Sequence, residues 1–149
     1  MAIEGEYVPS PSGWVRDQVE EYEKSGGTAG TTLNDSGLPV VVMTMVGHRS
    51  GTIRKVPVMR VEYDGVYAAV ASKGGAPDNP LWTENLRQNP HVELRDGTEV
   101  SDRFAREISG AERDLWWARC VEAFPNYAEY QTRTTRVIPV FLLEPVAPA

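Results

Sequence analysis

The chain has 149 residues, of which 41% are hydrophobic and 24% are charged, and its formal net charge is −6. These values are ordinary for a single globular domain, and the negative charge argues against a general affinity for nucleic acid or anionic lipid. No apolar run approaches the roughly 18 residues that a membrane span needs, and the first residues have no signal-peptide pattern, so we expect a cytoplasmic protein.

The first predicted element is a helix over residues 12–27, with Trp14, Val15, Val19 and Tyr22 along one stripe and a glycine pair at its end. This helix and the loop that follows it form an N-terminal segment, residues 1–36, ahead of the main body at residues 37–149. The Val-rich run 38–46 predicts a strand buried on both faces. Partial alternation over 53–63, the turn dipeptide Asp64-Gly65 and the run 66–72 then predict a hairpin.

A short helix is predicted over residues 78–90, with Asn79 as its N-cap and Pro80 at its first helical position. Residues 91–95 and 99–108 form a second predicted hairpin, joined at Asp96-Gly97, and two further helices are expected over 110–125 and 126–134. The apolar run 136–146 predicts a closing strand. About six mainly antiparallel strands with flanking helices indicate an α+β fold whose sheet is curled into a barrel.

The cysteine and histidine content predicts no metal site. Cys120 is the only cysteine and falls in a helical pattern, where we expect it to be a small buried hydrophobe. His48 and His91 lie far apart in sequence and match no zinc-binding motif.

Positive charge is concentrated in one part of this acidic chain. Residues 44–81 hold five basic residues, including Arg49, Arg54 and Lys73, against three acidic ones. The loop "GHRSGT" follows a buried strand, and its glycines let backbone N–H groups approach an anion between Arg49 and Arg54. A solvated turn with ordinary surface arginines is the alternative.

Two more stretches are candidates for a site. In "ASKGGAPDNPLW", a strand end leads into Lys73, two glycines and Trp82, which suits a planar ligand with an anionic tail, although such glycines also mark ordinary turns and Trp82 also suits a core. In "FPNYAEYQTRT", Tyr127 and Tyr130 lie three residues apart on one helical face. Their hydroxyls can donate hydrogen bonds or a proton in a pocket, or can simply face water.

Together and in this order, "GHRSGTIRKVPV", "ASKGGAPDNPLWTENLRQNP" and "FPNYAEYQTRTTRVIPVFLLEP" resemble the deazaflavin-dependent nitroreductase family, over about Val40 to Glu144. The resemblance implies a split β-barrel related to flavin-binding oxidases. It also implies coenzyme F420, an 8-hydroxy-5-deazaflavin with a phosphodiester and an oligoglutamate tail, as the hydride donor to an electron-poor small molecule.

By its motifs, the resemblance assigns the cofactor's phosphate and tail to the basic residues Arg49, Arg54 and Lys73, with His48 beside them. It also implies that a second group of residues frames the deazaflavin ring: Val56, Pro57, Gly74, Gly75, Ala76, Pro77, Trp82, Asn85 and Leu86. Tyr127, Tyr130 and Ser72 are its candidate proton donors, with Tyr127 first among them. Met59 and Phe124 join the two tyrosines in the substrate pocket.

This chain departs from the nitroimidazole-reducing relatives at two pocket positions, where Phe124 replaces a tyrosine and Met59 replaces another aromatic residue. Quinones, activated enones and unsaturated lactones are therefore better expected substrates than nitro compounds. Flavin mononucleotide on the same barrel and a non-catalytic carrier of the cofactor or of another anionic amphiphile stay as alternatives. No interface can be identified from the residues, so both a monomer and a homodimer fit.

Overall fold

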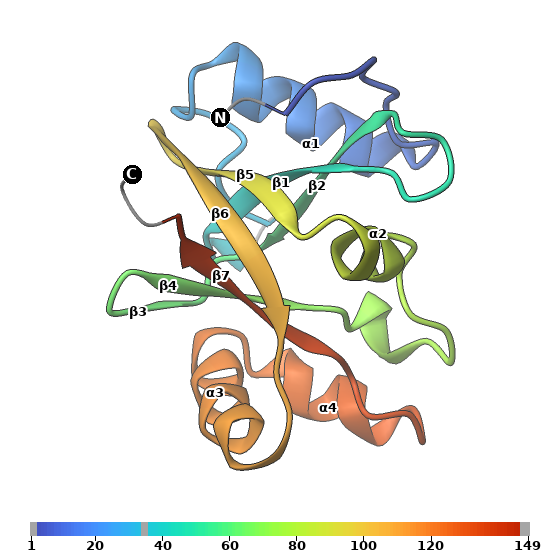
Figure 1. The fold of residues 1–149 in the computed structure, drawn as a ribbon. Coiled ribbons are helices and arrows are strands. Elements are labelled where there is room, and N and C mark those ends of the chain that lie inside the picture. Colours follow the sequence, from blue (N-terminus) through green and yellow to red (C-terminus); the bar gives the residue numbers. More distant parts are fainter. Residues whose placement is uncertain (1–2, 34–35, 147–149) are drawn as a thin grey trace.

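The computed structural model describes residues 3–33 and 36–146 (Figure 1). The elements follow in the order α1 (Gly13–Lys24), β1 (Val40–Val46), β2 (Ile53–Met59), β3 (Glu62–Tyr63), β4 (Val66–Val70), the 3₁₀ turn η2 (Lys73–Gly75), α2 (Trp82–Gln88), β5 (His91–Asp96), β6 (Glu99–Glu107), α3 (Gly110–Ala123), α4 (Asn126–Thr132) and β7 (Val140–Pro145). No helix in these ranges is long and apolar enough to cross a membrane.

All strands belong to one antiparallel sheet with the order β2-β1-β5-β6-β7-β4-β3. Figure 1 shows α1 at one end of the curled sheet, at the top of the view, and α3 and α4 at the other end. The predicted α+β class and the predicted antiparallel sheet are confirmed. The strand beyond the expected six is the two-residue β3.

Strands β1, β4 and β7 are buried on both faces, and in each of them the two faces belong to different cores. In β1, Val40 and Val42 pack in a core that includes residues of α1, α3 and α4, among them Val19 and Trp116. Val41, Met43 and Met45 face a second core, which contains Leu86 of α2. Because neighbouring side chains of a strand point to opposite faces, this double burial explains the uninterrupted apolar run in β1.

The predicted continuous strand over residues 53–63 is wrong, because the chain breaks at Arg60 and Val61. The Arg60 N–H donates to Pro39 O at 3.0 Å, whereas Val61 O accepts from Ala68 N at 2.9 Å. The break moves the chain from the β1 side of the sheet to β4. β2 and β3, neighbours in sequence, therefore lie at opposite ends of the strand order.

The predicted start of the short helix is also wrong. α2 begins at Trp82 with Leu81 as its N-cap residue, so neither Asn79 nor Pro80 has the predicted position. The Asn79 side chain instead accepts a hydrogen bond from Arg136 Nη1 at 2.7 Å. The same guanidinium holds residues 71–76, and the closing strand β7 accordingly begins at Val140, four residues later than predicted.

Tyr22 docks α1 onto the sheet. Its ring is fully buried, and its hydroxyl donates to Val40 O at 3.2 Å and accepts from the Gly97 N–H at 2.6 Å. Gly27, just after the helix, lies so close to the β5–β6 turn that an added Cβ would meet Gly97 O at 1.7 Å. The N-terminal helix is thus fixed to both β1 and the second hairpin.

We predict that Tyr22→Phe lowers the free energy of unfolding by about 1–3 kcal/mol, because backbone groups of Val40, Arg95 and Gly97 lose a hydrogen-bond partner while the ring stays in place. Urea unfolding followed by circular dichroism measures the loss. Tyr63→Phe is the matched control, since Tyr63 is 54% exposed, and it should change stability by less than about 0.5 kcal/mol. Equal stabilities for the two variants would mean that the hydroxyl does not hold α1.

Candidate functional site

A cavity of about 660 Å³, called the main cavity below, lies between α1, the β1–β2 hairpin, η2, α2 and α4. Its volume falls within the range of about 300–1,000 Å³ that is usual for small-molecule sites. The predicted site residues that line it are Arg54, Val56, Pro57, Met59, Ser72, Lys73, Gly74, Trp82, Asn85, Phe124, Tyr127 and Tyr130. The structure thus brings together residues from all three stretches singled out in the sequence.

Three cations line this cavity, but only two of them are free of an ion pair. Lys55 Nζ lies 2.7 and 2.8 Å from the two carboxylate oxygens of Glu23 on α1, so its charge is already compensated. The side chains of Arg54 and Lys73 make no hydrogen bond or ion pair with any residue in the described ranges. Their charges are available to an anion.

The segment that carries Lys73 has an unusual backbone. Lys73, Gly74 and Gly75 have φ angles of 46°, 65° and 80°, so three successive residues lie in the left-handed region. Gly75 packs against α4, where an added Cβ would lie 2.5 Å from Tyr130 O. The glycines therefore allow the turn and its close approach to α4, and the turn presents Ser72, Lys73 and Gly74 to the cavity.

An aromatic wall from the end of α3 and from α4 also lines the cavity. The rings of Phe124 and Tyr127 meet edge-on with centroids 5.0 Å apart, and Tyr130 lies 6.1 Å from Phe124 and 6.3 Å from Tyr127. Burial raises the pKa of the Tyr127 phenol above its ordinary value, and Cys120 and Tyr130 add to that rise. Tyr127 therefore keeps its proton at neutral pH. No group in the described residues hydrogen-bonds its hydroxyl, so this O–H is available to a ligand.

Comparison with known proteins places this chain in a family. Residues 14–145 match the sequence model of the F420H(2)-dependent quinone reductase family. The F420H(2)-dependent quinone reductase Rv1261c of Mycobacterium tuberculosis is 32% identical over 108 residues, which cover 70% of this chain and 72% of that protein. The chain belongs to the F420H(2)-dependent quinone reductase family.

Solved structures agree with this assignment. A structure described as an F420-H2 dependent reductase, FDR-A, is 55% identical with a TM-score of 0.68, and the match covers 71% of this chain and 94% of that one. A structure described as a domain-swapped dimer is 51% identical with a TM-score of 0.71, covering 91% and 100% of the two chains. A pyridoxamine 5′-phosphate oxidase-like protein of Listeria innocua, 15% identical with a TM-score of 0.51, shares the fold over 72% of this chain and 84% of that one.

The predictions of an F420-dependent reductase, of the split-barrel fold and of F420 as cofactor are thus confirmed by the family, ahead of the flavin mononucleotide alternative. The cavity fits such a cofactor. Unpaired Arg54 and Lys73 suit an anionic tail, and the apolar side chains of Val56, Pro57 and Trp82 suit a planar ring.

Several residues that the family resemblance assigns to the cofactor do not line the cavity. They are His48, Arg49, Gly75, Ala76, Pro77 and Leu86. Leu86 is buried in the second core, and Arg49 is exposed in the β1–β2 turn. His48 ties that turn to α2, because its backbone N–H donates to Asn85 Oδ1 at 3.0 Å and its Nδ1 lies 2.6 Å from the same oxygen.

The N-terminal segment supplies a cavity wall that the sequence analysis missed. Ser10, Pro11, Ser12, Trp14, Val15 and Leu33 all line the cavity, and Leu81, 82% exposed, joins them from the start of α2. Trp14 is 56% exposed although it lies on the apolar stripe of α1. The sequence signal for this wall is Trp14 itself, a large aromatic residue in the first turn of an otherwise acidic helix.

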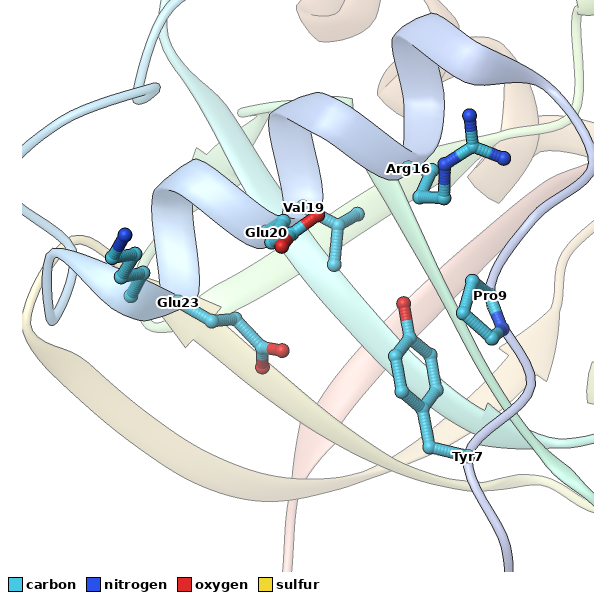
Figure 2. Close-up of a pocket in the computed structure, with 7 residues that line it drawn as sticks. Tyr7, Pro9, Arg16, Val19, Glu20 and Glu23 are labelled. Atoms are coloured by element: carbon cyan, nitrogen blue, oxygen red, sulfur yellow. The ribbon is translucent and has the colours of Figure 1, made fainter.

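A second cavity of about 450 Å³ lies between the N-terminal segment and α1, with Tyr7, Arg16, Glu20 and Glu23 around it (Figure 2). None of the predicted site residues is among those that line it. Its charges serve the packing of α1, because Glu23 binds Lys55 of β2 and the Lys55 ammonium lies 5.1 Å from the centre of the Tyr7 ring. Lys55 lines the main cavity, so its contacts with Glu23 and Tyr7 connect the two cavities.

Proposed function

We propose that this protein uses the main cavity to transfer a hydride from reduced F420 to quinones and to related electron-poor carbonyl compounds, such as activated enones and unsaturated lactones. One observation carries the proposal. A single cavity is lined both by two cations whose side chains are unpaired and by an aromatic wall that contains a buried, protonated phenol.

On the cofactor side, Arg54 and Lys73 bind the phosphodiester and the glutamate tail by charge-assisted hydrogen bonds. Val56, Pro57 and Trp82 frame the ring, and Trp82 is held in place by packing against Phe141, with ring centroids 6.1 Å apart. When bound, reduced F420 supplies the hydride. The protein's contribution is to align the acceptor with the ring and to exclude water.

On the acceptor side, Tyr127 is the proposed proton donor. Reduction of a quinone or an enone leaves negative charge on an oxygen, and the O–H of a phenol that lines the cavity can stabilise that charge by donating a hydrogen bond. Tyr130 and Ser72 line the same cavity and are the further candidates. Phe124 and Met59 offer no O–H, so this part of the wall favours an apolar planar acceptor.

The anion site can be tested with Arg54→Ala and Lys73→Ala. Each substitution should weaken F420 binding by about 1.5–3 kcal/mol, because a hydrogen bond to a charged group is lost, and the loss should shrink as salt rises. Titration of F420 fluorescence measures the affinity, with flavin mononucleotide titrated in parallel and expected to bind poorly. Lys24→Ala, an exposed lysine outside the main cavity, is the control.

Unchanged F420 affinity in both variants would contradict the assignment of Arg54 and Lys73. A third variant, Arg49→Ala, distinguishes a tail bound in the cavity from a tail bound over the β1–β2 turn. A loss as large as that of Arg54→Ala would put the anionic tail over the β1–β2 turn, outside the cavity. Preference of the wild-type protein for flavin mononucleotide would contradict the proposed use of the cavity.

Tyr127→Phe should lower kcat with menadione about a hundred-fold while leaving F420 affinity nearly intact, because only the O–H is removed. Since the pKa of Tyr127 is raised by burial, its proton is kept through the alkaline range, and the wild-type rate should not fall between about pH 7 and 9 through ionisation of this phenol. Tyr63→Phe, outside the cavity, is the control. Equal losses of kcat and cofactor affinity would mean that Tyr127 has a different role.

The oligomeric state that we propose is a homodimer, because a solved structure 51% identical to this chain is described as a domain-swapped dimer. Size-exclusion chromatography with light scattering should give twice the mass of one chain across a range of protein concentrations. A single-chain mass at all concentrations would contradict the proposal.

A further inference from the structure

We infer that Arg136 is a positioning residue for the cofactor site, which holds the segment of residues 71–79 in the shape that presents Lys73 to the cavity. The inference rests on the proposed function, because it takes Lys73 as a ligand of the cofactor's anionic tail. Arg136 lies outside the main cavity and acts only through that segment.

One guanidinium makes four hydrogen bonds to this segment. Arg136 Nε donates to Ala76 O at 2.9 Å, and Nη2 donates to Ser72 O at 2.8 Å. Nη1 donates to Ala71 O at 3.2 Å and to Asn79 Oδ1 at 2.7 Å. The planar fork of an arginine therefore satisfies acceptors from both ends of an irregular loop at once.

The segment needs such support because its own backbone makes few internal hydrogen bonds. Between β4 and α2 the only regular piece is η2, with the bonds Gly75 N to Ser72 O at 2.9 Å and Ala76 N to Lys73 O at 3.1 Å. Lys73 has a φ of 46°, a conformation that a residue with a side chain rarely adopts. Surrounding contacts must therefore hold this turn, and Arg136 supplies the bonds on both sides of Lys73.

The charge of Arg136 is not used in an ion pair. No carboxylate in the described residues pairs with it, and all four of its acceptors are neutral oxygens. Two roles can then be separated by experiment: a geometric role, in which the fork shapes the loop, and an electrostatic role, in which the positive charge alone attracts the anionic tail. The four-bond geometry favours the first.

The test compares Arg136→Gln and Arg136→Lys with wild type by F420 titration at low and high salt. For a geometric role, both variants should bind F420 about ten-fold more weakly, with a salt dependence parallel to that of wild type, because Arg54 and Lys73 keep their charges. Restoration of affinity by Arg136→Lys together with a flatter salt dependence for Arg136→Gln would overturn the inference in favour of charge.

A double-mutant cycle tests the coupling to Lys73. If Arg136 acts through Lys73, then Arg136→Gln in a Lys73→Ala background should cost less than about two-fold in F420 affinity. Full additivity of the two losses would overturn the inference. In kinetics, kcat/KM for reduced F420 should fall while the KM for menadione stays near its wild-type value.

Hydrogen exchange of the protein without cofactor gives a readout independent of the proposed function. Arg136→Gln should speed exchange of the Gly75 and Ala76 amides, which make the two hydrogen bonds of the turn. Unchanged exchange overturns the inference even where F420 binding to wild type supports the proposed function. Failure of wild type to bind F420, with faster exchange in the variant, overturns the proposed function and with it the cofactor role of Arg136.

Arg106→Gln is the matched control, because Arg106 also makes four side-chain hydrogen bonds, to Glu112 and Glu144, and none of them reaches the loop. It should leave F420 affinity and the exchange of the turn unchanged. Thermal unfolding checks that each variant is folded. If Arg136→Gln does not fold, Asn79→Ala removes one acceptor only and should shift affinity and exchange in the same direction by a smaller amount; no shift in either would overturn the inference.

Discussion

The burial of β1 on both faces is the constraint on which the rest of the structure depends. A strand with two apolar faces needs a cover on each side, and here α1, α3 and α4 contribute to one core and α2 to the other. The sheet curls between them, and the chain breaks at Arg60 to pass from β2 to β4. The main cavity lies where these covers meet around the β1–β2 hairpin, so the site is a consequence of how the sheet is enclosed.

Local charge pairing divides the basic residues of this acidic chain into two groups. Lys55 is bound by Glu23, and Arg60 Nε lies 2.9 Å from Asp96 Oδ2, so these cations fasten α1 and the β5–β6 turn to neighbouring elements. Arg54 and Lys73 have no such partner at the cavity. A positive site in a chain of net charge −6 therefore arises because Glu23 of α1 pairs with Lys55, whereas no carboxylate in the described residues pairs with Arg54 or Lys73.

Periodicity and turn chemistry predicted most of the strands, hairpins and helices, because β1 has no polar face and both hairpins carry an Asp-Gly turn. They could not predict the break at Arg60, since the partial alternation over 53–63 has no turn signal there and the bonds that cause the break come from Pro39 and Ala68. The role of Arg136 was equally hidden, because its acceptors lie at least 57 positions away in the sequence. Motif resemblance found residues from both sides of the cavity but not the wall from α1, which lies outside the matched motifs.

The two sides of the cavity come from different parts of the chain, and this has a consequence for specificity. In the proposed function, the cofactor is bound by β2, the turn at Lys73 and α2, and the acceptor by α4 and the N-terminal segment with Trp14, all of which line the main cavity. Trp14 is half-exposed and α1 is anchored by Tyr22 at its far end, so the first turn of α1 can change its side chains without disturbing that anchor. If the proposed function holds, changes in this wall should alter the choice of acceptor while Arg54 and Lys73, the proposed ligands of the deazaflavin tail, stay in place.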